Sequence, residues 1–139
     1  MLAVSTLMAA SASARQKLTI EEMKGQITNL KVGDRPPACI RISEEQLEAA
    51  DRFYQAGDSQ KGKAALIDVE TFAELARDYA IQSHKHEKQS EIAVRKMVRK
   101  LGDIKRLVSI DDQADVQRTA DGLQRVRDDL LAAMFPKAG

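Results

Sequence analysis

The sequence predicts an all-α protein, an antiparallel helical bundle or coiled coil with one long central helix flanked by shorter ones. The 139 residues include three phenylalanines, two tyrosines and no tryptophan, and are rich in alanine, leucine and charged side chains. This composition favours helices. Alternating β-branched or aromatic runs, which mark strands, do not reach a useful length. Apolar residues instead recur every three or four positions after helix-capping residues, which is the helical pattern.

The first fourteen residues have the features of a secretory signal peptide. Residues 2–12 form a short apolar stretch that runs into Ala12-Ser13-Ala14, a small-residue cleavage site before Arg15. The stretch is too short for a membrane span, which takes about 20 residues. No lysine or arginine precedes Leu2, although signal peptides normally open with positive charge. Two alternatives therefore stay open: the true start lies upstream of Met1, or this segment is no export signal but a frayed apolar N-terminus or an amphipathic helix docked on the folded body.

Residues 15–41 are expected to form a short helix and a proline-containing linker. Thr19 and Glu22 form a capping box, and the apolar spacing that follows predicts a helix over about 20–31. Because two consecutive prolines cannot continue a helix, residues 32–41 are expected to be extended. This linker carries the single cysteine, Cys39. Burial as a small hydrophobic side chain is favoured for it over a disulfide to another chain.

The helical bundle domain is expected over residues 42–136. Its first helix, about 44–56, is predicted by a second capping box that starts at Ser43 and by a C-terminal Gly57. Asp58 or Ser59 then caps the next helix. The turn between the two helices is very short, so they should be antiparallel neighbours.

The middle of the chain is expected to form one long helix over about 60–108. Its seam positions follow one another at steps of three or four, averaging about 3.5, which is the period of a coiled coil. They are Leu66, Val69, Phe72, Ala76, Tyr79, Ser83, Glu87, Ser90, Val94, Met97, Leu101, Ile104 and Val108. Three of these, Ser83, Glu87 and Ser90, are poor core residues. The alternative is therefore a compact four-helix bundle in which the chain breaks near 82–90.

A last helix is expected between Ser109 and Pro136, folded back on the second half of the long helix. The charge distribution agrees with this packing. Residues 84–108 carry a net charge of +5, whereas residues 109–135 carry −3 and residues 40–82 carry −4. Opposite blocks on adjacent helices attract, although each exposed pair contributes only about 0–1 kcal/mol. We expect this pairing to fix the register of the helices.

The sequence contains residues for two candidate cofactor sites, a metal site and a haem site, and favours neither. His84, Glu87 and Glu91 fall on one face of a continuous helix, and their side chains suit zinc or iron, but a fourth ligand is missing. A solvated polar crossing point between two packed regions is the preferred interpretation. A b-type haem held by His84 or His86 with Met97 or Met134 is disfavoured, because few aromatic residues are present to line a macrocycle.

The basic face of the long helix has the composition of a polyanion-binding surface. Its members are Arg95, Lys96, Arg99, Lys100, Lys105 and Arg106. The net charge of the chain is only +1, and no aromatic side chain lies between these residues to stack a base. Pairing with the acidic blocks of the same chain is therefore preferred over binding of nucleic acid. Motifs of catalytic nucleophiles and phosphate-binding loops are missing, so no catalytic, cofactor-binding or metal-binding residue is predicted.

Two resemblances accompany these patterns. The segments Tyr54-Gln55-Ala56-Gly57-Asp58 and Lys63-Ala64-Ala65-Leu66 resemble the turn of a single tetratricopeptide-like helical hairpin, without the 34-residue recurrence of an array. More broadly, residues 49–136 resemble uncharacterised exported bacterial all-helical proteins. The cues are the Tyr-x-x-Gly-Asp turn, Lys88-x-x-Glu91-Ile92-x-x-Arg95-Lys96-Met97, and Val126-Arg127-x-Asp129-Leu130-Leu131-x-x-Met134-Phe135. The resemblance implies a helical fold and an envelope or secreted location, and it assigns no functional residue.

The function expected from the sequence is that of an exported, non-enzymatic helical protein in the periplasm or medium. It would act in protein–protein interaction or as an envelope scaffold, through self-association or a protein partner, without nucleic acid and without a membrane span. The alternative is a carrier that binds a small ligand or a metal inside the bundle.

Overall fold

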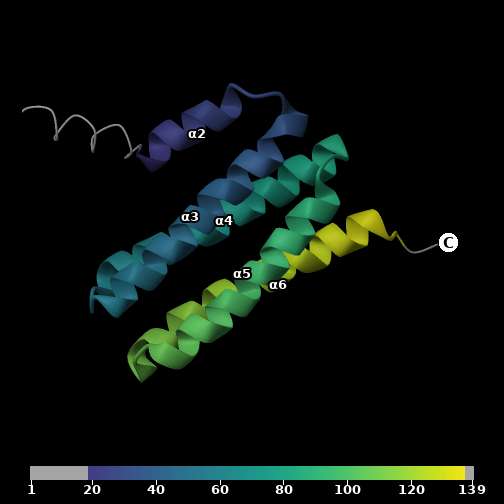
Figure 1. Ribbon diagram of the computed structural model, residues 1–139. Helices are drawn as coiled ribbons and strands as arrows, with labels where there is room; N and C mark the ends of the chain where they lie inside the picture. The colour runs from purple at the N-terminus through teal and green to yellow at the C-terminus, as the bar shows by residue number, and fades with distance from the viewer. Residues whose placement is uncertain (1–18, 137–139) are drawn as a thin grey trace, which may run out of the picture.

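The computed structural model describes residues 19–136, which form five α-helices and one short 3-10 helix and contain no strand (Figure 1). The helices are α2 (Ile20–Thr28), α3 (Arg35–Gln55), α4 (Ser59–Ser83), α5 (Glu87–Leu107) and α6 (Ile110–Met134), with η1 (Val32–Asp34) between α2 and α3. The prediction of an all-α antiparallel bundle is confirmed. The predicted signal peptide, residues 1–14, lies outside the described residues.

The short helix α2 begins as the sequence predicts. The Thr19 side-chain oxygen accepts a hydrogen bond from the Glu22 backbone N–H at 3.1 Å. At its other end, the Arg35 guanidinium donates to the carbonyls of Thr28 (3.1 Å) and Leu30 (3.0 Å). The same guanidinium lies 4.9 Å from the centre of the Tyr79 ring. Arg35 therefore fastens the end of α2 to both α3 and α4.

The prediction that residues 32–41 form an extended linker is wrong. Residues 32–34 form η1, and α3 already begins at Arg35, so the two prolines occupy the first turn of a helix. Proline is accepted there because the first backbone N–H groups of a helix have no intrahelical partner. The helix predicted to start at 44 is therefore nine residues longer at its N-terminal end. Ser43 lies inside it and is fully buried.

The turn between α3 and α4 is the one predicted. Gly57 adopts a positive φ of 78°, which glycine tolerates without strain. The Asp58 side chain then accepts a hydrogen bond from the Lys61 backbone N–H at 3.2 Å, as an N-cap residue does. The predicted helical hairpin is present.

The prediction of one continuous helix over residues 60–108 is also wrong. The structure has the alternative arrangement, in which the helix breaks near residues 82–90. Helix α4 ends at Ser83 and α5 starts at Glu87. Between them His84 (φ 56°) and His86 (φ 65°) both adopt the left-handed conformation. Histidine is among the residue types that enter this region more readily than most. The apolar period resumes in phase after the turn, so the pattern alone did not reveal the break.

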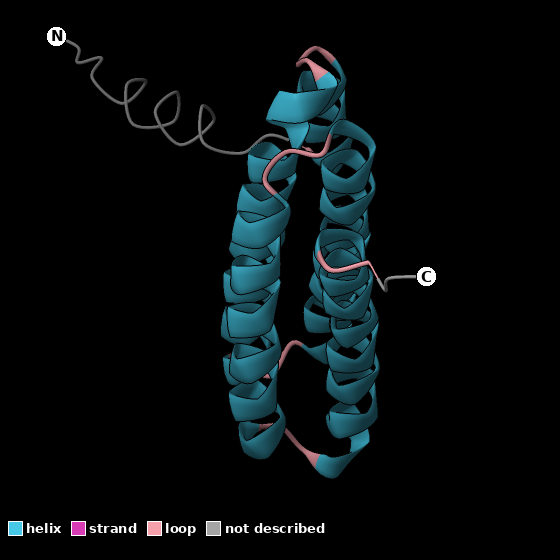
Figure 2. Cartoon of the chain, turned by 90° about the vertical axis from the view of Figure 1, so that its right-hand side faces the viewer, coloured by secondary structure: helices cyan, strands magenta, loops and turns pink. Residues whose placement is uncertain are grey.

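The four long helices form two antiparallel hairpins, α3 with α4 and α5 with α6, as expected. Helix α4 also packs along α6, whereas α3 and α5 run parallel and touch far less. Figure 2 shows the long helices side by side along one common direction. The core between them contains large, fully buried side chains such as Phe72, Leu66, Leu101, Leu123 and Leu130. The bundle is therefore packed tightly on its α4–α6 side and loosely on its α3–α5 side.

Candidate functional site

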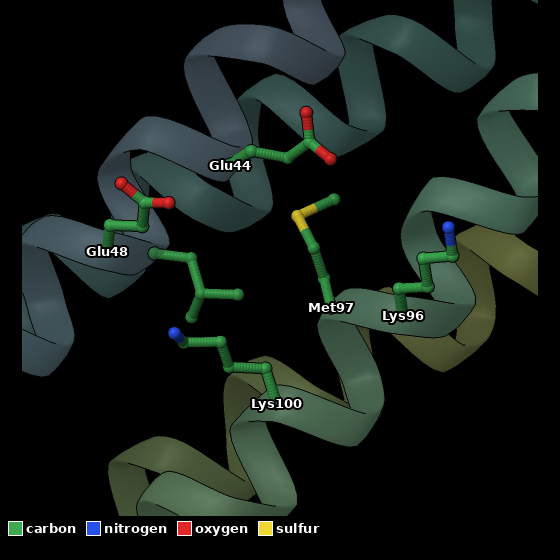
Figure 3. Close-up of a pocket in the computed structure, with 6 residues that line it drawn as sticks. Glu44, Glu48, Lys96, Met97 and Lys100 are labelled. Carbon is green, nitrogen blue, oxygen red and sulfur yellow. The ribbon is translucent and has the colours of Figure 1, made fainter.

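The loose side of the bundle carries a groove between α3 and α5. It contains two consecutive hollows, of about 160 Å³ and about 270 Å³, which share Glu44 as a lining residue. The smaller hollow is lined by Glu44, Leu47, Glu48, Lys96, Met97 and Lys100 (Figure 3). The larger one is lined by Pro37, Ile40, Arg41, Glu44, His86, Gln89 and Ser90. We call these two hollows together the α3–α5 groove.

Helical spacing gives the groove an apolar floor and charged walls. On α3, Glu44 and Glu48 are one turn apart and Leu47 lies beside them. On α5, Lys96 and Lys100 flank Met97 in the same way. In Figure 3 the Met97 side chain points from α5 toward α3, with the acidic side chains on one side and the lysines on the other. The groove is thus acidic along α3 and basic along α5.

A buried hydroxyl group fixes the floor of the groove. Ser43 is fully buried, and its hydroxyl donates to the Val69 carbonyl of α4 at 2.7 Å. The same oxygen lies 3.6 Å from the Met97 sulfur, which accepts a weaker hydrogen bond. Ser43 therefore links α3, α4 and α5 at one level. The capping role predicted for it is wrong, since it lies in the middle of α3.

Only one ion pair joins the two walls of the groove in the described part of the chain. Lys100 Nζ lies 3.7 Å from Asp51 Oδ2 at the end near the α3–α4 turn. Glu44, Glu48 and Lys96 are exposed and form no ion pair with any other described residue. Opposite charges thus face each other across the groove with their hydrogen-bonding capacity free.

The remaining basic side chains are partly neutralised within the chain. Arg95 pairs with Glu91 at 3.6 Å and Arg106 pairs with Asp103, both on α5 itself. Lys105 donates to the Gln117 side chain of α6 at 2.8 Å. The expected pairing with a different charge block is therefore seen at Lys100 and Asp51, whereas Arg95 and Arg106 use their own helix.

The candidate metal ligands are not brought together. His84 and His86 occupy the turn, whereas the nearly buried Glu91 receives a hydrogen bond from Arg127 of α6 at 2.7 Å. Glu87 has one buried oxygen without a partner in the described chain. No group of three or more histidine, cysteine, aspartate or glutamate side chains within 19–136 has the arrangement of a metal site. His84 and Lys85 are exposed, as in the solvated crossing point preferred from the sequence, whereas Ser90 and Glu91 are buried.

Of the haem ligands derived from the sequence, Met97 is separated from the histidines. It lies in the floor of the groove, eleven residues beyond His86, which is about 16 Å along a helix. Met134 is the last residue of α6, which runs antiparallel to α5 and ends toward the start of α5.

Two further reactive side chains are withdrawn into the bundle. Cys39 is free and fully buried, and burial raises the pKa of its thiol to about 12. Tyr54 packs over Gly62, and burial followed by the charges of Asp112 and Asp115 raises the pKa of its phenol to about 12. Both groups stay uncharged at neutral pH.

Sequence reasoning missed the acidic wall of the groove. Lys96 and Lys100 belong to the basic face that it identified, but Glu44 and Glu48 were counted only as part of an acidic block. The available signal was their spacing of four residues around Leu47, together with the same spacing of two lysines around Met97.

Comparisons with protein-family models, with curated proteins and with solved structures each found no match for this chain. No helix within residues 19–136 is long and apolar enough to cross a membrane.

Proposed function

We propose that this chain is an exported, non-enzymatic helical protein that works by binding another protein segment in the α3–α5 groove. The observation that carries the proposal is the pair of facing walls, with Glu44 and Glu48 on α3 and Lys96 on α5 lacking partners within the described residues. Between these walls lie Leu47 and Met97. Charged walls of opposite sign steer a partner to the surface and fix its register.

The dimensions of the groove suit a helix. Its lining on α3 extends from Pro37 to Glu48, and Asp51 lies one turn further. The eleven steps from Pro37 to Glu48 correspond to about 16 Å of helix, or roughly three turns. Binding of an amphipathic helix in such a groove is a common mode of recognition.

Export is part of this proposal and depends on the signal peptide predicted over residues 1–14. Processed protein from the natural cells should begin at Arg15 and appear in the periplasm or medium. An N-terminal sequence that begins at Met1, in a cytosolic fraction, would contradict export while leaving the groove binding intact.

Site-specific photocrosslinking tests the binding role. A photoreactive amino acid is placed at Glu48 on the groove wall, and at Asp121 on α6 as the control, because Asp121 is exposed and does not line the groove. After irradiation of the natural cells, we expect a discrete crosslinked species from position 48 and none from position 121. Equal crosslinking from both positions, or none from position 48, would contradict the proposal.

A further inference from the structure

We propose that the two walls of the α3–α5 groove bind the same walls of a second copy of this chain, related by a twofold axis that runs along the groove. This inference rests on the function proposed above and names the partner. It follows from how the charges of the two walls are arranged relative to each other.

The relative direction of α3 and α5 follows from their common neighbour α4. Helix α3 is antiparallel to α4, and α5 is antiparallel to α4, so α3 and α5 run in the same direction (Figure 1). The charged side chains of the two walls also have the same position along the bundle axis. Glu44 and Glu48 line the same hollow as Lys96 and Lys100, so the acidic and basic rows lie at one level along the bundle.

A twofold axis along the groove exchanges the positions of the two walls. It places α3 of one copy over α5 of the other, and the heights of the side chains are kept. Glu44 and Glu48 of one copy then face Lys96 and Lys100 of its partner, and the reverse contact forms at the same time. Such an interface is isologous, because the same surface is used by both copies.

Twofold axes in other directions do not give this match. An axis across the groove, in the plane of the contact, places α3 over α3 and α5 over α5. Glutamates then face glutamates and lysines face lysines. Like charges that face each other repel, which disfavours this arrangement relative to the first. The charge pattern thus selects one geometry of self-association.

The strength of the contact follows from its chemistry. Leu47 and Met97 are almost fully covered within one copy, so the contact relies mainly on the charged walls. Pairs of exposed charges contribute little individually and are screened by salt. The dimer should therefore form at low ionic strength and high protein concentration, and dissociate as salt is added.

Charge reversal on the full chain tests the proposal. One variant carries Glu44→Lys with Glu48→Lys, which makes both walls basic, and the other carries Lys96→Glu with Lys100→Glu, which makes both walls acidic. In sedimentation experiments at low salt, each variant alone should show a dimer dissociation constant raised about tenfold or more over wild type. A mixture of the two should restore a heterodimer, because basic walls then meet acidic walls.

Two further variants control for folding and for net charge. The fourfold variant, with all four reversals, restores opposite charges within and between copies and should dimerise like wild type. Lys31→Glu with Lys63→Glu changes the net charge as much as the lysine reversal on the groove does, but neither residue lines the groove. This control variant should also keep the wild-type dissociation constant.

The possible results distinguish failure of the proposed partner from failure of the proposed function. A wild-type chain that stays a 15.4 kDa monomer up to about 0.5 mM at low salt overturns self-association. A dimer that survives both reversals also overturns it, and places the contact elsewhere, such as the exposed Leu107 and Ile110. In either case, a crosslink from position 48 to a different protein would keep the proposed function. Absence of that crosslink as well would remove both.

Discussion

Where two helices approach each other most closely, the size of a single side chain limits the contact. Gly62 of α4 is one of these, since a Cβ atom added there would lie 2.8 Å from two carbons of the Tyr54 ring. The ring is rigid and packed against the core, so it has little room to move. Gly102 of α5 is the opposite case, because an added Cβ would meet no atom within 4 Å.

We therefore expect opposite effects of the same substitution at these two glycines. Gly62→Ala should lower the free energy of unfolding by about 1–2 kcal/mol, because overpacking outweighs the gain in helix propensity. Gly102→Ala should raise it by about 0.5–1 kcal/mol, since it only stabilises the helix. Denaturant unfolding followed by circular dichroism measures both. Stabilisation at position 62 would contradict the close contact with Tyr54.

Glu70 of α4 gives stability a dependence on pH. Burial, and then the neighbouring Glu74, raise the pKa of its carboxyl group, against the smaller opposing effect of Arg125 and Arg118. Between the ordinary pKa of about 4.5 and this raised value, the folded state binds more protons than the unfolded state. The free energy of unfolding therefore falls as pH rises through this window.

Glu70→Gln removes this effect without much change in shape. The variant should be more stable than wild type at pH 7, because burial disfavours the charged form of the half-buried carboxyl group. The difference should disappear near pH 3, because the carboxyl group is then neutral in both states. Urea unfolding at both pH values provides the comparison. A variant that is destabilised at pH 7 would show that Arg118 and Arg125 dominate the environment of this group.

At the scale of the elements, α5 has both buried and exposed leucines. Leu101 is fully buried, while Leu107 in the same helix has 81% of its surface exposed. Loss of a buried leucine removes contacts and leaves a cavity, whereas loss of an exposed one does neither.

Leu101→Ala should accordingly lower the free energy of unfolding by about 2–5 kcal/mol. Leu107→Ala is the matched control and should change it by less than about 0.5 kcal/mol. Thermal and denaturant unfolding of both variants give the comparison. Similar losses at the two positions would mean that α5 is rotated relative to the packing described above.

The sequence predicts most helix ends but not the two places where local chemistry overrides the hydrophobic period. The capping residues Thr19 and Asp58 and the turn at Gly57 act as predicted. The prediction that Pro36 prevents a helix is wrong, because the first turn of a helix accepts proline. The break after Ser83 depends on two left-handed histidines, and the apolar spacing continues across it in phase.

At the scale of the whole molecule, the hairpin pairs were predictable and their relative placement was not. Short turns make α3 pair with α4, and α5 with α6, in almost any bundle of this length. The contact of α4 with α6 depends on side-chain packing, for example on Gly122, where an added Cβ would lie 2.4 Å from the Glu70 carboxyl group. That contact leaves the opposite side open. The α3–α5 groove could therefore not be predicted from spacing, although its lysines were.

The central claim is that the chain folds back at residues 84–86, which brings α5 beside α3 and creates the groove. Contacts at the far end of the bundle support this, since the Ser59 hydroxyl at the start of α4 donates to Asp112 near the start of α6 at 2.7 Å. Residue 63 is near the start of α4 and residue 106 near the end of α5, just before α6, so both should lie near the same end of the molecule. Both side chains are exposed and accept labels.

Pulsed electron paramagnetic resonance between spin labels at Lys63→Cys and Arg106→Cys measures this most directly. Cys39 is buried and the pKa of its thiol is raised to about 12, so it stays unlabelled in the folded protein. The folded-back bundle predicts a single distance of roughly 30 Å or less, because α4 and α5 are each packed on α6 with axes about 8–10 Å from it, and the label arms add to that separation. A continuous helix through residues 84–86 would separate the labels by about 65 Å, and such a distance would contradict the account.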